Sequence, residues 1–353
     1  MRKISASQIA DIARGAAIMG TGGGGDPYIG RLLAEQAIAA HGPVTLVEID
    51  EVPPDAVVVP VAMMGAPTVM VEKLPSGTEI AAVLAALGEV LGRHPTHIAC
   101  IEAGGVNSTI PFAAAAFTGL PLVDADGMGR AFPELQMVLP TLAGVATTPL
   151  ALADEKGNTA ILRTIDNHWA ERLARSATVE MGCSATTAQY VLRGDQLAEA
   201  MVAGTLSRAE QLGAVVARAR AAHADPVAAA AEELSGRLLF TGKVTDIARR
   251  TTSGFARGTA ALSGDGSTLE LEFQNEHLVA RRDGKVVASV PDLICVLDTD
   301  TGEPVTTEAL RYGLRVSVLG VPCDARWRTP QGLALVGPGY FGYDHEYQPV
   351  EGS

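Results

Sequence analysis

The chain has 353 residues, of which 47% are hydrophobic and 4% are aromatic, and its formal net charge is −13. This length is large for a single hydrophobic core, so we expect two domains in a globular α/β protein. The negative charge makes nucleic acid and acidic membrane surfaces poor partners. The four cysteines lie far apart in the sequence, which indicates neither a disulfide framework nor a zinc knuckle.

The N-terminal segment predicts an amphipathic helix. Ser5 and Gln8 form a capping-box pattern, and apolar residues follow at helical spacing up to Ala17. This pattern is unlike the core of a signal peptide, and no apolar run in the chain is long enough to span a membrane. We therefore expect a cytoplasmic protein.

Five glycines lie within residues 20–25, directly after this helix. A backbone without Cβ atoms can approach a ligand closely. Asp26 and Pro27 predict the start of a second helix, whose free N–H groups would attract an anion or a polarised carbonyl group. A dinucleotide-binding loop would have to follow a strand, and a Walker loop would need a Lys-Ser or Lys-Thr pair, so we expect no nucleotide. The alternative is a connector between helices that binds no ligand.

Short β-branched runs alternate with helical patterns up to residue 165. Strands are predicted at 44–49, 57–63, 97–101 and 121–123, and helices at 79–91 and 113–117. This alternation predicts a largely parallel sheet covered by helices. Residues 145–153 and 159–165 predict a hairpin, and we place the end of the N-terminal domain directly after it, at residue 165.

The second domain, residues 166–353, predicts helices followed by a β-rich module. Its helical segments are 166–177, 194–222 and 226–234. From residue 237 onward, short strands alternate with glycine- and aspartate-containing turns, which is typical of an antiparallel barrel or sandwich. The predicted fold class is therefore α/β, with an N-terminal helix-covered sheet, intervening helices and a C-terminal antiparallel β domain.

Polar residues follow the predicted strand ends of the first domain, where open α/β sheets bind ligands. They include Glu102, Asn107, Asp124 and Asp126. A carboxylate that follows a buried strand can lose its hydration, and the resulting rise in its pKa suits acid or base catalysis. The alternative for each carboxylate is a structural role in a turn or a helix cap.

Glu180 and Cys183 place a carboxylate and a thiol three residues apart beside a glycine. The apolar neighbours of Glu180 predict that this carboxylate is buried, which is costly without a function. Cys183 is a candidate nucleophile, although no basic residue in the stretch would stabilise its thiolate and an inert buried cysteine is the more common case. His168 and Glu171 share one face of a helix and could bind a metal ion, with a solvated face as the alternative.

Five segments together strongly resemble the S-methyl thiohydantoin desulfurase-like family. They are residues 20–27, 124–134, 180–182, 273–276 and 291–294. The resemblance extends over essentially the whole chain and includes both domains of the family. It implies hydrolytic removal of sulfur from an (S-methyl) thiohydantoin-type five-membered ring, in nitrogen-heterocycle catabolism beside hydantoinase- and oxoprolinase-like proteins.

This chemistry needs a base, an acid for the leaving thiol and donors for negative charge on the ring. We assign acid and base roles to a group of four carboxylates, and a covalent route would use a thiol nucleophile. The candidate catalytic residues are Glu102, Asp124, Asp126, Glu180 and Cys183. The candidate substrate-binding residues are Gly22, Gly23, Gly24, Gly25, Asp26, Asn107, Arg130 and Asn275, of which Arg130 would bind a substrate carboxylate in a bidentate manner.

A divalent metal ion could be held by Asp124, Asp126 or His168, although no recognised ligand spacing is present. We expect a small cyclic amide or thioamide substrate and a homo-oligomeric assembly. Two other functions remain open at this point: a hydantoinase- or amidase-like hydrolase of a cyclic amide, and a non-catalytic subunit of a hydantoinase- or oxoprolinase-type complex. The acidic strand ends favour an enzyme.

Overall fold

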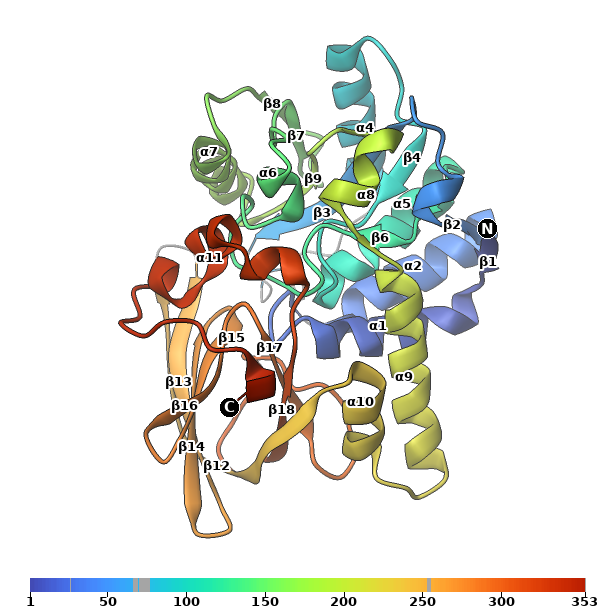
Figure 1. The fold of residues 1–353 in the computed structure, drawn as a ribbon. Coiled ribbons are helices and arrows are strands. Elements are labelled where there is room, and N and C mark those ends of the chain that lie inside the picture. Colours follow the sequence, from blue (N-terminus) through green and yellow to red (C-terminus); the bar gives the residue numbers. More distant parts are fainter. Residues whose placement is uncertain (26, 66–68, 70–76, 253–254, 353) are drawn as a thin grey trace.

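The computed structural model describes residues 1–25, 27–65, 69, 77–252 and 255–352. Figure 1 shows a mixed sheet with its covering helices in the N-terminal part and a curved antiparallel sheet in the C-terminal part. The predicted fold class is confirmed. Asp26, one of the predicted substrate-binding residues, lies outside the described residues. Within the described ranges, no helix is both long and apolar enough to cross a membrane.

The N-terminal sheet has nine strands in the order β1-β2-β5-β4-β3-β9-β7-β8, with β10 also paired to β3. The neighbours β2, β5, β4 and β3 run parallel, as predicted, and the flanking strands are antiparallel. Their bounds are β1 Arg2–Ile4, β2 Val44–Val47, β3 Val57–Gly65, β4 His97–Ala99, β5 Leu122–Val123, β7 Leu150–Ala153, β8 Thr159–Leu162, β9 Ser184–Ala188 and β10 Leu192–Arg193. Because β3 is central, its side chains are buried on both faces, which explains its unbroken apolar sequence.

Helices cover this sheet and connect it to the second one. α1 begins after Ser5, whose backbone N–H donates to Gln8 Oε1 at 2.9 Å, so the predicted cap is confirmed. α1 packs closely on α9 because Gly15 and Gly213 leave room for the facing backbone. The bounds are α1 Ala6–Met19, α2 Pro27–His41, α4 Thr78–Leu91, α5 Ile110–Thr118, α6 Leu139–Leu142, α7 Asn167–Glu180, α8 Leu197–Ala200, α9 Thr205–Ala221, α10 Pro226–Leu234 and α11 Pro330–Val336. Short 3₁₀ turns are η1 Ile49–Glu51, η2 Gly105–Ser108, η3 Gly194–Gln196, η4 Ala325–Arg328, η5 Pro338–Phe341 and η6 Val350–Gly352.

The C-terminal sheet is fully antiparallel, in the order β16-β15-β14-β13-β12-β18-β17. Its strands are β12 Arg237–Thr252, β13 Phe255–Gly264, β14 Ser267–Gln274, β15 Glu276–Arg282, β16 Lys285–Ser289, β17 Leu293–Asp298 and β18 Arg315–Val321. Side chains on one face of its strands, such as Leu262, Leu271 and Val318, form an apolar core that belongs to this sheet. A small ribbon of β6 Ala125–Asp126 and β11 Val202–Ala203 is separate from both sheets.

The boundary that the sequence predicts after residue 165 does not separate the two sheets. β9 and β10 lie beyond it, yet both pair with β3 of the N-terminal sheet. The C-terminal sheet begins only with β12. Sequence patterns mark the end of the β7–β8 hairpin correctly, but they carry no information on where a later strand pairs.

Arg130 connects the two halves of the molecule and is completely buried. Its guanidinium donates five hydrogen bonds within the protein, and its planar face lies 4.5 Å from the centre of the Phe132 ring. The acceptors are the carbonyl oxygens of Ala131, Pro291, Asp292 and His277 and the hydroxyl of Thr21. The predicted role of Arg130 as a clamp for a substrate carboxylate is therefore wrong, because all five donors are already used.

We expect Arg130→Met to destabilise the protein by about 3–5 kcal/mol, since buried acceptors on both halves would lose their donor. Urea unfolding measures this loss. Arg193→Gln is the matched control, because the Arg193 side chain is 59% exposed and pairs with Asp195 at the surface. Equal unfolding midpoints for the two variants would contradict this role of Arg130.

Candidate active site

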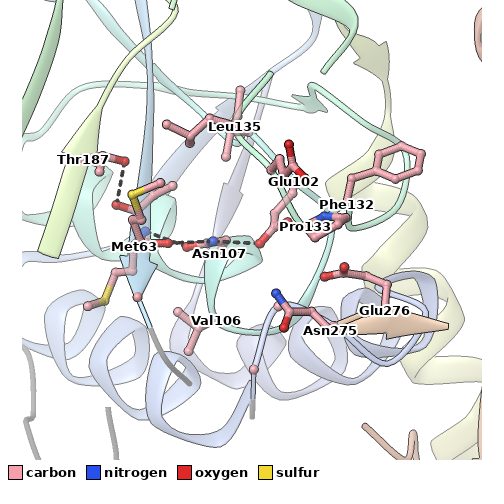
Figure 2. A pocket seen from close by; sticks show the side chains of 18 of the residues that line it. Met63, Glu102, Val106, Asn107, Phe132, Pro133, Leu135, Thr187, Asn275 and Glu276 are labelled. Carbon is pink, nitrogen blue, oxygen red and sulfur yellow. Dashed lines mark hydrogen bonds between the residues drawn. The ribbon is translucent and has the colours of Figure 1, made fainter. Parts of the chain in front are cut away.

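A cavity of about 110 Å³ lies where the parallel strands end and the tip of the β14–β15 hairpin approaches them. Its wall is apolar in part, with Met63, Phe132 and Leu135 among the lining side chains. Figure 2 shows two polar groups entering it from different sides, Glu102 with Asn107 on one side and Asn275 with Glu276 on the other. The strand-end site that the sequence predicts is thus completed by residues of the C-terminal sheet.

Glu102 follows β4 and is only 6% exposed. Burial raises the pKa of this carboxyl from its ordinary value of 4.5 to about 7, and the charge of nearby Asp126 adds to the rise. A hydrogen bond from Asn107 opposes it in part. Glu102 can therefore either accept or release a proton near neutral pH.

Asn107 fixes the orientation of Glu102. Its Nδ2 donates to Glu102 Oε1 at 2.7 Å and to the Met63 carbonyl oxygen at 3.0 Å, while its Oδ1 accepts from the Met63 backbone N–H at 2.6 Å. Both amide hydrogens are used within the protein. Asn107 thus positions Glu102, and its predicted role in orienting ring amides remains a prediction.

Glu276 is the first residue of β15 and is 2% exposed. Burial raises its pKa well above the usual range, the charge of Glu102 raises it further, and Arg130 acts in the opposite direction. Its Oε2 has no hydrogen-bond partner among the described residues. The raised pKa favours the protonated form of Glu276, which can donate a hydrogen bond to a ligand.

The glycine loop has two roles in the structure. Gly23, Gly24 and Gly25 line the cavity, as predicted for a rim of bare backbone. Gly22 lies outside the lining, and its carbonyl oxygen accepts from the Thr307 backbone N–H at 2.9 Å. A Cβ atom on Gly23 would come within 2.0 Å of Glu276 Oε1, so the loop is bare chiefly because the C-terminal sheet packs directly on it.

Asn275 lines the cavity beside Glu276 in the positive-φ conformation that asparagine tolerates, with φ 59°. Its Oδ1 accepts from the Ala256 backbone N–H at 2.9 Å, which fixes the side chain. Its predicted contact with the ring remains a prediction.

Asp124 and Asp126 stabilise the backbone instead of entering the cavity. Asp124 accepts from the backbone N–H groups of Leu206 and Ser207 at the start of α9. Asp126 is fully buried and accepts from four donors, which are the backbone N–H groups of Ala103, Met128 and Gly129 and the hydroxyl of Thr205. The sequence-based assignment of both as acid or base residues is not supported, because their oxygens are occupied by structural donors.

Glu180, Cys183 and His168 also lie outside the cavity lining. Glu180 is exposed at the end of α7, which corrects the expectation that apolar neighbours would bury it: Val179 beside it is itself 54% exposed. Cys183 is half-buried in the turn before β9, and His168 is exposed on α7. Within the described ranges, no three His, Cys, Asp or Glu side chains gather in a way that could hold a metal ion.

Glu276 and Gln189 are among the cavity residues that the sequence-based site does not include. Glu276 belongs to the polar stretch 273–277 that interrupts an alternating strand pattern, and this interruption is the signal that could have identified it. Gln189 follows the buried run of β9, where a single large polar residue is unusual. Both are distant in sequence from Glu102, so no local spacing connects them.

The fold and the site together define a two-domain α/β protein with an acidic cavity at the carboxyl ends of its parallel strands. The chain belongs to the S-Me-THD-like family: the N-terminal domain of the family matches residues 7–164 and the C-terminal domain matches residues 165–350. The resemblance found in the sequence is thereby confirmed.

A protein from Chromobacterium violaceum, whose structure was solved by X-ray crystallography, has the same fold. It is 26% identical to this chain, with a TM-score of 0.82, and the similarity covers 99% of this chain and 100% of that one. No curated protein matches the chain.

The raised pKa of Glu102 predicts a specific pH dependence of stability. Between about pH 4.5 and 7 the folded protein holds a proton on Glu102 that the unfolded chain has lost, so this residue lowers stability as pH rises. Glu102→Gln removes the effect and should raise the free energy of unfolding at pH 8 by about 2–3 kcal/mol. Denaturant unfolding at pH 5 and 8 measures it, with Glu180→Gln as control; a variant that is no more stable than wild type at pH 8 would refute the desolvated carboxylate.

Gly23→Ala should displace Glu276, because the new methyl group would overlap Glu276 Oε1. We expect at least a ~10-fold weaker affinity for any ligand of the cavity, since an ångström-scale displacement is sufficient for such a loss. Gly339→Ala is the control, because nothing lies within 4 Å of the place that its methyl group would occupy. Calorimetric titration of the two variants makes the comparison, and unchanged affinity in Gly23→Ala would show that Glu276 does not contact ligand.

Proposed function

We propose that this cavity hydrolyses a thiohydantoin-type five-membered ring, in particular its S-methyl form, and releases the thiol. One observation carries the proposal: Glu102, a buried carboxyl group with a pKa of about 7, shares the cavity with Glu276, a second buried carboxyl group whose pKa is raised by burial. Two carboxyl groups with different proton affinities are the requirement for paired base and acid catalysis. Membership of the S-Me-THD-like family supports this choice of substrate.

In the first step, a water molecule attacks the ring carbon that carries sulfur. Glu102 in its carboxylate form takes one proton from this water, and Glu276 donates its proton to N1, the ring nitrogen doubly bonded to that carbon. The new C–O bond replaces the C=N double bond, which leaves a neutral tetrahedral intermediate that carries both a hydroxyl group and the sulfur substituent.

In the second step, the intermediate collapses and the C–S bond breaks. The hydroxyl proton returns to Glu276 as the carbonyl group forms, and Glu102 gives its proton to the departing sulfur. The products are the hydantoin ring and a free thiol, and both glutamates regain their starting protonation states. The overall reaction consumes one water molecule and needs no oxidant or reductant.

The surroundings of the two glutamates suit these two reaction steps. Asn107 donates a hydrogen bond to one oxygen of Glu102, which fixes the plane of the carboxyl group. The position of the other oxygen is thereby fixed as well. Backbone of Gly23, Gly24 and Gly25 can approach a flat ring closely because it carries no side chains. Apolar neighbours such as Phe132 and Leu135 lower the local polarity, which strengthens each hydrogen bond to the ring.

The rate of thiol release should depend on pH with the sign set by these two groups. We expect kcat/KM to rise about tenfold per pH unit below pH ~7, as Glu102 becomes deprotonated, and to fall at higher pH, where Glu276 becomes ionised. Glu102→Gln and Glu276→Gln should each lower it by about 10²–10⁴-fold. A thiol-reactive chromophore measures release from an S-methyl thiohydantoin, and Glu180→Gln is the control with an exposed carboxylate.

A parallel assay with unsubstituted hydantoin distinguishes desulfurisation from the two alternative functions, a cyclic amide hydrolase and a non-catalytic subunit. Ring opening of hydantoin without thiol release would indicate a cyclic amide hydrolase. A chain inert towards both rings would contradict catalysis and favour the non-catalytic subunit. Full thiol release by Glu102→Gln would refute the assigned base while leaving the reaction itself intact.

A further inference from the structure

Gln189 is a completely buried residue of the cavity wall, and its side-chain amide makes no hydrogen bond with the described part of the chain. Its relative exposure is 0%, and neither its Nε2 nor its Oε1 has a hydrogen-bond partner among the described residues. Buried amide groups without partners are rare and cost free energy. Of the buried polar side chains that lack partners within the described ranges, only Gln189 and Glu276 line the cavity.

The backbone on both sides of Gln189 is held firmly. Its own N–H donates to the Pro60 carbonyl oxygen at 3.2 Å, and Ala188 before it pairs with Val61 of β3. Tyr190 after it is buried, and its hydroxyl donates to the Leu135 carbonyl oxygen at 3.0 Å. The carboxamide therefore extends from a rigid part of the central sheet, which is the preorganisation that a recognition group requires.

A carboxamide presents an N–H donor and a carbonyl acceptor side by side in one plane. Its complement is the edge of a cyclic amide, where a ring N–H lies next to a ring carbonyl group. Glutamine reads adenine through the same two-bond pattern, which uses one donor and one acceptor. A carboxylate ligand has no hydrogen to donate to Oε1, so it would satisfy only Nε2 of Gln189.

We propose that Gln189 is the specificity residue that recognises the amide edge of the ring substrate, with Nε2 donating to the C4 carbonyl oxygen and Oε1 accepting from N3–H. This inference rests on the proposed function for its choice of ring. It assigns the edge remote from N1 to Gln189, so that N1 and the sulfur-bearing carbon face the two glutamates. The ligand class is a cyclic amide with adjacent N–H and carbonyl groups.

The test uses binding of hydantoin, 3-methylhydantoin and 1-methylhydantoin to the full chain, measured by calorimetry. Wild type should bind 3-methylhydantoin on the order of 10–100-fold more weakly than hydantoin, because the methyl group removes the N3–H donor. The loss of affinity for 1-methylhydantoin should be much smaller. In Gln189→Met, hydantoin should bind about as weakly as 3-methylhydantoin. Equal affinity of wild type for hydantoin and 3-methylhydantoin would overturn the proposal without any variant.

Thermal unfolding distinguishes recognition from a structural role. Gln189→Met should unfold at the same or a higher temperature than wild type, because an unpartnered amide is replaced by an apolar chain of similar length. Thr187→Val is the matched control, because Thr187 lies two residues earlier on the same cavity wall and its hydroxyl donates to the Ala62 carbonyl oxygen at 3.2 Å. It should unfold earlier and keep the preference for hydantoin. A lower unfolding temperature for Gln189→Met with unchanged ligand preference would overturn the proposal.

The failure of this inference is distinguishable from the failure of the proposed function. Wild type that shows the predicted binding pattern but releases no thiol would refute desulfurisation and retain the role of Gln189. If wild type releases thiol but Gln189→Met keeps the wild-type binding pattern, desulfurisation would be retained and the role of Gln189 refuted. Wild type that binds none of the three rings would overturn the recognition role.

Discussion

The buried guanidinium of Arg130 is the constraint on which the rest of the site depends. A cation removed from water needs an acceptor for every N–H, and these acceptors come from the glycine loop, from β15 and from the segment before β17. Because the acceptors lie on both halves of the chain, satisfying Arg130 fixes the two sheets against each other. The cavity between the strand ends and the β14–β15 turn is a consequence of this junction.

The junction also explains why two carboxyl groups can be buried beside each other. Glu276 lies close enough to Arg130 for its charge to moderate a pKa that burial and Glu102 raise. Glu102 receives one hydrogen bond from Asn107, which offsets only part of the effect of burial on its pKa. The pKa of Glu102 therefore remains near neutral. Such incompletely compensated groups lower stability, and proteins retain them where they have a function. The unpartnered amide of Gln189 belongs to the same class.

The elements of this fold that depend on local pattern could be predicted, and those that depend on distant contacts could not. The cap of α1, the parallel strands and the β7–β8 hairpin follow from spacing within a few residues. Glu102 can be identified because it follows a buried strand. The sequence misassigns Arg130 because two of its acceptors lie 161 and 162 residues further along the chain. It misassigns Glu180 because apolar neighbours at the end of α7 are exposed.

Glu102 is a desolvated carboxyl group whose pKa lies near neutral pH in the resting protein. Infrared difference spectroscopy between wild type and Glu102→Gln isolates the carboxyl band of this one residue as pH is varied. We expect a protonated carboxyl band that converts to the carboxylate band with a midpoint near pH 7. A midpoint near pH 4.3, the pKa of an ordinary exposed glutamate, would contradict a desolvated Glu102.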